Sequence, residues 1–270
     1  RRVNLRDATL YATRLERADL SEAQLGGARL EGASLEGANL TGADLTGAVL
    51  PRAKLARATL TDATFEEVTA DGADFSGVRG EQTVFVRASL VGACFDGAAL
   101  ASPDFTEVRA EKARFVGATL SRARCYEADL RGVTLDGATL PCFRGEQADL
   151  SSASLVGVEA EGSVFESAKL DRATLRQARL TGSSFVRATA RRADFSQVDL
   201  REGRLAHADL GGSILVRANL LGADLESANL VVADLRGANL HATNLWLAVL
   251  TDAPLGGAIL TGSTLEARPR

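Results

Sequence analysis

The sequence is poor in the side chains that carry most protein chemistry. Among its 270 residues it has no methionine, one tryptophan, two histidines and three cysteines. Cys94, Cys125 and Cys142 match no metal-binding or redox spacing, and His207 and His241 have no neighbouring zinc-type pattern. We therefore expect no metal, no cofactor and no disulfide, and the thiols favour a reducing, cytoplasmic compartment.

Long apolar runs and an excess of one charge are also missing. No stretch approaches the ~20 apolar residues of a membrane span, and no signal peptide is recognisable. The net charge of −4, from 31 basic and 35 acidic residues, offers no basic patch for direct nucleic-acid binding. Because methionine is absent even at residue 1, we expect that the chain is part of, or truncated from, a longer protein.

What the sequence does have is a period of five. When each pentad is numbered so that its last residue, the centre, is divisible by five, the chain holds 270/5 = 54 pentads without an insertion or deletion. Leucine occupies 37 centres and phenylalanine 9, and alanine occupies 36 of the positions two residues earlier. Of the 26 glycines, 20 stand two residues after a centre. Such a period indicates a repeat architecture.

A five-residue period fits neither a helix nor a long flat strand. At about 100° per residue the leucines would spiral around a helix, and in a strand an odd period would place them on alternate faces. Short strands broken by corners do fit, because Ala38 and Leu40 then point inward, Asn39 points outward, and Thr41 and Gly42 turn the chain. Coils of this kind must stack on one another to bury their leucines, so we predict a solenoid.

The repeated pattern of alanine, aspartate or asparagine, and leucine, as in Ala18-Asp19-Leu20 and Ala238-Asn239-Leu240, resembles the pentapeptide-repeat family over the whole chain. The resemblance implies an all-β fold: a right-handed parallel β-helix of square, quadrilateral section, with about 13 coils of four pentads each. We expect residues 1–270 to form one such β-helix.

The unusual centres test the square section. Six phenylalanines from Phe65 to Phe115 recur every ten residues, so with twenty residues per coil they alternate between opposite walls. Small centres such as Ala70 and Ala190 stand between phenylalanines, and Gly145 has Phe143 two residues before it. We interpret this as volume compensation in a densely packed interior. An interior filled in this way leaves no substrate cleft, and no catalytic motif is present, so we expect no enzyme activity.

Function must then lie on the outer surface. The face with centres Leu5, Leu25, Leu45 and onward carries more acidic than basic residues, and we interpret it as a candidate recognition face for a basic partner. Its candidate acidic residues are Asp44, Glu66, Glu67, Asp104, Glu107, Glu127, Glu146 and Glu166.

A second candidate is an apolar cluster near the end of the chain, on a surface that is otherwise polar. Its members at outward or corner positions also include Ile214, Val249 and Ile259, and Trp246 is of the residue type favoured at binding hot spots. The candidate protein interface consists of Val216, Leu221, Val231, Val232, Trp246 and Leu247.

Two functions follow. The first is a non-enzymatic interaction or scaffold domain of a bacterial protein, which docks through residues 214–260 to another domain, to a second copy or to another protein. The second comes from the resemblance: family members that mimic DNA bind a type II topoisomerase, DNA gyrase, and protect it from quinolone antibiotics or toxins. The phosphates of duplex DNA provide about one negative charge per 1.7 Å of its axis, and this chain carries far less negative charge than that.

Overall fold

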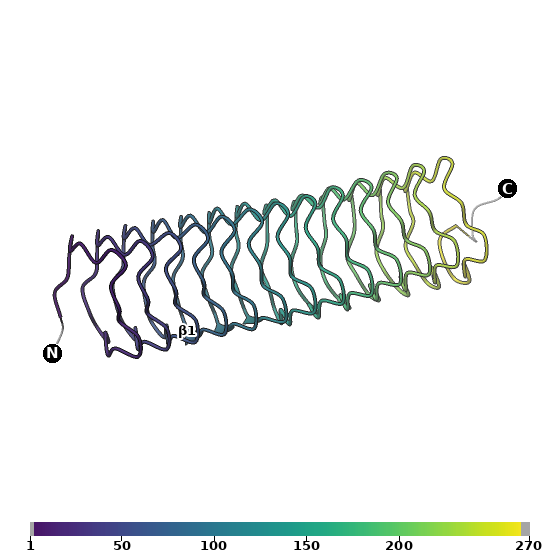
Figure 1. Cartoon of the computed structure of the whole chain (residues 1–270). Coiled ribbons are helices and arrows are strands. Elements are labelled where there is room, and N and C mark those ends of the chain that lie inside the picture. The colour runs from purple at the N-terminus through teal and green to yellow at the C-terminus, as the bar shows by residue number, and fades with distance from the viewer. Residues whose placement is uncertain (1–2, 266–270) are drawn as a thin grey trace. The chain divides into compact units, whose positions relative to one another are not determined.

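The computed structural model describes residues 3–265. The chain divides between Thr139 and Leu140 into two compact units. Within each unit the chain winds into coils that stack in sequence order (Figure 1). The predicted β-helix solenoid is confirmed, and none of the described residues forms a helix. Accordingly, no helix in residues 3–265 has the length and hydropathy needed to cross a membrane.

Coils are joined by parallel pairing between residues twenty apart. In the first unit Asp19 pairs with Asn39 and Asp44 with Thr64, and in the second Asp194 pairs with Ile214. Each coil therefore contains four pentads. The N–H of most centres donates to a carbonyl in the next coil, as from Leu25 to Asp44 at 2.6 Å. This ladder satisfies the backbone polar groups that the buried centres bring into the interior.

Three short strands stand out in the first unit. They are β1 (Arg79–Glu81), β2 (Ala99–Ala101) and β3 (Thr119–Ser121), which form a parallel sheet in the order β1-β2-β3. The register pairs Gly80 with Leu100 and Leu100 with Leu120. After β2 the chain continues into Pro103, which has no N–H to close the usual turn.

Elsewhere the corner is a β-turn. The N–H of the residue three positions after a centre donates to the carbonyl of that centre, as from Ala28 to Leu25 at 3.0 Å. The residue two after the centre, which we call the corner residue, is left-handed. Gly42 has φ 66° there, but so do residues with side chains, such as Arg17 and Glu67 at φ 56°. The stacked coils thus impose this conformation on L-residues that ordinarily avoid it.

The interior confirms the predicted packing of the phenylalanine rings. Phe65 and Phe85 stack on one wall with ring centroids 5.0 Å apart, while Phe75 and Phe95 stack on the opposite wall at 4.6 Å. Rings from the two walls meet edge to face, as Phe65 and Phe75 do at 5.8 Å. The rings fill much of the interior and leave little volume beside them. This explains why small centres occur next to them.

The small centre at Gly145 in the second unit has the predicted cause. A Cβ atom added to Gly145 would lie 2.5 Å from the ring of Phe143, which is buried. The ring therefore occupies the space that a leucine centre would otherwise fill.

Candidate protein-binding surface

The predicted acidic face is largely neutralised by arginines in the first unit. Arg87 forms ion pairs with Glu66 at 2.6 Å and Glu67 at 2.9 Å, and its pKa is raised chiefly by the hydrogen bond to Glu67. Its backbone N–H donates to the coil that also holds Glu107, so a positive charge lies between the two exposed corner carboxylates. Such exposed pairs contribute little to stability.

The remaining aspartates of this face in the first unit also have basic partners. Asp44 lies 3.6 Å from Arg6, and Asp104 lies 3.7 Å from Arg124. The pKa of Asp44 is lowered mainly by its hydrogen bond with Thr46.

In the second unit Glu146 pairs with Arg144 at 2.6 Å and Glu166 with Arg204 at 3.9 Å. Of the eight predicted acidic residues, only Glu107 and Glu127 have no ion pair among residues 3–265. The face is therefore a set of alternating charges and not a continuous anionic row.

The structure separates the predicted apolar interface residues into two groups. Val216 and Leu221 are half-buried and lie at the two corners of the coil that do not border the wall of Val249, whereas Val231, also half-buried, and Trp246 lie at the two corners that do. Val232, Trp246 and Leu247 are exposed, at 58%, 57% and 60% of their surface.

The exposed group gathers around one wall. The chain runs from the corner at Trp246-Leu247 directly into the wall that carries Val249, which points outward and pairs with Asn229 of the preceding coil. Asn229 accepts a hydrogen bond from the N–H of Val231 at 3.1 Å, and Val232 donates to the next coil at Thr251. We call these exposed residues, together with the half-buried Val231 beside them, the corner surface: Val231, Val232, Trp246, Leu247 and Val249.

Two members of the corner surface have an unfavourable backbone. Val232 and Leu247 are left-handed corner residues with φ 54° and 58°. All other non-glycine residues recorded with positive φ in residues 3–265 are charged, polar, alanine or cysteine. A β-branched residue with positive φ is an outlier, and the left-handed region costs an L-residue roughly 1–2 kcal/mol.

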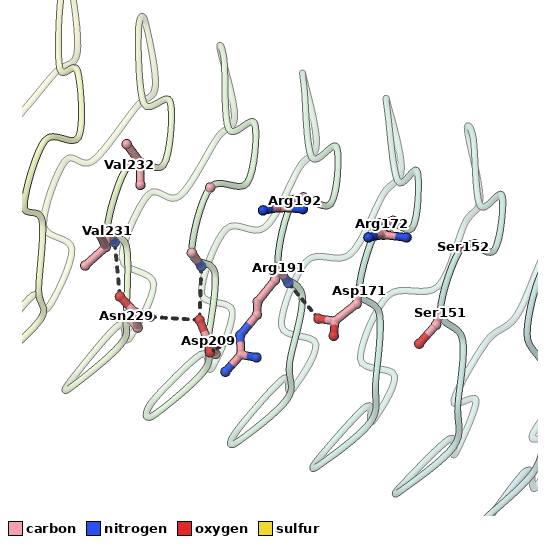
Figure 2. A pocket seen from close by; sticks show the side chains of 12 residues that line it. Ser151, Ser152, Asp171, Arg172, Arg191, Arg192, Asp209, Asn229, Val231 and Val232 are labelled. Atoms are coloured by element: carbon pink, nitrogen blue, oxygen red, sulfur yellow. Dashed lines mark hydrogen bonds and ion pairs between the residues drawn. The ribbon is translucent and has the colours of Figure 1, made fainter.

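A groove of about 600 Å³ begins at the corner surface and follows the same wall toward lower residue numbers. Figure 2 shows its lining side chains on successive coils, with Arg172, Arg192 and Val232 along one corner. The other lining residues are Ser151, Ser152, Asp171, Arg191, Asp209, Gly211, Gly212, Asn229 and Val231.

The polar floor of this groove is a hydrogen-bonded network (Figure 2). The guanidinium of Arg191 donates to Asp209 at 2.6 Å, and this bond is the main cause of its raised pKa. Asp171 accepts the backbone N–H of Arg191, and Asp209 accepts the amide of Asn229 at 2.9 Å. The network fixes Arg191, whereas Arg172 and Arg192 have no ion pair in the described part of the chain.

The sequence analysis did not find this groove. Its signal was present, because Arg172 and Arg192 stand twenty residues apart at the corner position. No other two arginine or lysine corner residues are neighbours in this way.

Within residues 3–265 no cluster of three or more His, Cys, Asp or Glu side chains is arranged to hold a metal ion. Cys94, Cys125 and Cys142 form no disulfide within residues 3–265, and burial is the main cause of the raised pKa of Cys94. His207 is an exposed corner residue, and His241 contacts Thr261 through Nδ1 at 2.7 Å.

A family model described as pentapeptide repeats matches the chain in eight copies. They cover residues 1–37, 38–77, 65–100, 104–137, 128–166, 168–205, 204–241 and 228–266. No curated protein matches the sequence significantly.

Several solved structures are similar to the chain. Rfr23, a pentapeptide repeat protein from the cyanobacterium Cyanothece 51142, is 35% identical over 35% of this chain and 62% of its own, with a TM-score of 0.27. HetL from Nostoc sp. strain PCC 7120 is 29% identical over 87% of this chain and 90% of its own, with a TM-score of 0.23. Full-length QnrB1, a plasmid-mediated fluoroquinolone resistance protein, is 18% identical over 70% of this chain and 87% of its own, with a TM-score of 0.36. The chain thus spans less than two thirds of Rfr23.

Proposed function

This chain belongs to the pentapeptide repeat family, and we propose that it is a non-enzymatic, protein-binding scaffold of a bacterial protein. The observation that carries the proposal is the corner surface. Val232 and Leu247 expose large apolar side chains at positions where the backbone favours glycine. Neither solubility nor the fold explains this choice, and strained residues of this kind cluster where function requires them.

The chemistry of the corner surface suits a protein partner. Trp246 supplies a large amphipathic side chain of the type that dominates binding hot spots, and it is 57% exposed. Leu247 and Val249 provide apolar area beside it, at 60% and 47% exposure. We propose that an apolar segment of another protein covers these side chains and removes them from water.

Photo-crosslinking tests this proposal. A photoreactive p-benzoylphenylalanine is placed at position 246 or 247, and the protein is irradiated in the cells that make it. The matched control is position 167, since Ser167 is an exposed corner residue with φ 57° in the same unit. We expect a discrete protein adduct from 246 and 247 and none from 167. Equal labelling at all three positions, or none, would contradict a docking surface.

The identity of the adduct separates the partners. A second copy of the chain indicates self-association near the C-terminal end, a different protein indicates a scaffold, and a gyrase subunit indicates the topoisomerase function. The last has less support here, because ion pairs interrupt the acidic face at Arg87. If DNA mimicry holds, the protein inhibits or protects gyrase in a supercoiling assay, and Glu107→Lys with Glu127→Lys abolishes that effect.

We also propose the finer description of the fold that the family suggests. It is a right-handed β-helix of square section over residues 1–270, of which residues 1–2 and 266–270 lie outside the described part, with about 13 coils of twenty residues in a cytoplasmic protein.

A further inference from the structure

We propose that the groove beside the corner surface binds an extended peptide that carries one carboxylate and, three or four residues away, an aliphatic side chain. The carboxylate lies between Arg172 and Arg192, and the aliphatic side chain packs on Val231 and Val232. The inference deepens the proposed function, on which it rests, because it names the chemistry of a bound protein segment.

The guanidinium pair is the anion site. Arg172 and Arg192 are corner residues of adjacent coils, and the N–H of Arg172 donates to the carbonyl of Arg191. Neighbouring strands are about 4.8 Å apart, so two positive charges stand side by side without an ion pair among the described residues. An anion that lies between them relieves their repulsion. Arginine is the residue best suited to hold a carboxylate through two parallel hydrogen bonds.

A notch separates the arginines from the valines. The next corner residue after Arg192 is Gly212, and Gly211 precedes it, so this corner has no side chains. A Cβ added to Gly212 would lie 3.5 Å from Cγ of Arg192, so the arginine stem forms one side of the notch. Val232 forms the other side, one coil further on. Arg192 and Val232 are two coils apart, or about 10 Å, which an extended peptide spans in about three residues.

The charges around the groove set the direction of the bound peptide and the number of acidic groups that it carries. Asp252 is the corner residue that follows Val232 in the next coil, so it repels an acidic group at the apolar end. Three arginines and two aspartates line the groove, which gives it a net charge of only +1 (3 − 2). The aspartates disfavour a polyanion such as a nucleic acid or a free phosphate, whereas one carboxylate is balanced by the arginine pair.

A peptide-display selection tests the inference. The folded protein is immobilised and presented with a library of random linear heptapeptides. We expect enrichment of sequences with aspartate or glutamate three or four residues from leucine, isoleucine or valine. A synthetic labelled copy of an enriched peptide then gives a dissociation constant by fluorescence polarisation, and its affinity falls as salt rises.

The variants use glutamine, which the fold already accepts at left-handed corners such as Gln177 and Gln197. Arg172→Gln with Arg192→Gln is expected to weaken the peptide by about tenfold or more, since it removes both charge-assisted contacts. Gly212→Gln fills the notch and retains both arginines, and it is expected to weaken peptide binding by a similar factor. The matched control is Arg217→Gln, because Arg217 lies over Gly237 in the same way, 3.3 Å from its would-be Cβ, but outside the groove.

Enrichment without an acidic residue, or unchanged affinity in the double arginine variant, would overturn the inference. Failure of the proposed function appears differently. Trp246→Ser with Leu247→Ser removes the corner surface outside the groove, so it is expected to abolish the cellular adduct at an adjacent photoreactive position 249. The same variant leaves the selected peptide's affinity within about twofold. If the selection yields the expected peptide motif but the cells yield no adduct, the inference about the groove stands and the proposed docking surface is wrong.

Discussion

Residues 65–115 and residues 200–265 differ in where they depart from the pentad pattern, which is in the interior for the first stretch and on the surface for the second. In the first stretch the departures are internal, because it holds six phenylalanine centres, and three of the five centres between them are small, namely Ala70, Gly80 and Ala110. In the second stretch every centre is leucine. The surface shows the reverse: residues 65–115 expose no large apolar side chain, whereas six are exposed between 214 and 259.

The comparison separates two constraints. Interior side chains are limited by the available volume, so a ring on one wall favours a small residue on the next, although Leu90 and Leu100 are accommodated between rings. Corner residues are constrained by their left-handed backbone. The constraint is the same at Glu67, with φ 56°, and at Leu247, with φ 58°. The backbone therefore leaves the corner side chain to be set by solubility or by binding.

The largest expected effect is in the phenylalanine-rich stretch. Ala70→Leu adds volume beside Phe65 and Phe75, whose rings are already 5.8 Å apart, and is expected to cost about 1–3 kcal/mol in the free energy of unfolding in urea. Ala190→Leu, between Phe185 and Phe195, is expected to behave in the same way. Phe75→Leu in the Ala70→Leu background should recover part of the loss. Wild-type stability in both single variants would contradict volume compensation.

Two buried serines provide a smaller and paired test. Ser163 accepts the N–H of Phe143 at 3.2 Å and donates to the carbonyl of Leu140 at 3.1 Å, so Ser163→Ala should cost about 0.5–1.5 kcal/mol. The buried hydroxyl of Ser213 has no hydrogen-bond partner among residues 3–265. Ser213→Ala in the all-leucine stretch should be neutral or stabilising by thermal unfolding. A loss of equal size at both sites would reject the distinction.

The smallest expected effect is the pH dependence of the carboxylates on the outer surface. The hydrogen bond from Arg236 lowers the pKa of Asp234 below its usual value, and that from Arg201 does the same for Asp199. A lowered folded-state pKa stabilises the fold above the unfolded pKa, and this stabilisation is lost as the pH falls below about 4. Asp234→Asn should therefore flatten the acid side of a plot of unfolding free energy against pH. An unchanged slope would contradict it.

The sequence predicted the regular parts of this structure because they follow from a short period. Inward leucines, outward residues and ring packing depend only on the alternation of side chains and on twenty residues per coil. Even Gly145 was explained in advance by Phe143, because both compete for one interior volume. The left-handed conformation of the non-glycine corner residues was not predicted, since at Arg17 it is imposed by stacking and not by local preference.

The surface was predicted less well. Counting charges per face gave an acidic excess but could not show that Arg87 contacts both Glu66 and Glu67. The apolar cluster was found, but Val216 and Leu221 were grouped with it by chain position although they belong to other walls. The groove depends on how residues from five coils combine, and composition does not report such a combination.

The central claim is that Val232 and Leu247 serve binding and not the fold. The direct measurement is the free energy of unfolding of Val232→Gly with Leu247→Gly, beside a control with Gln197→Gly and Ser167→Gly at equivalent left-handed corners. The account predicts that the apolar variant is at least as stable as wild type and gains as much as the control, because glycine relieves the strain in both. A loss of stability in the apolar variant alone would show that these side chains support the coils, and would contradict the claim.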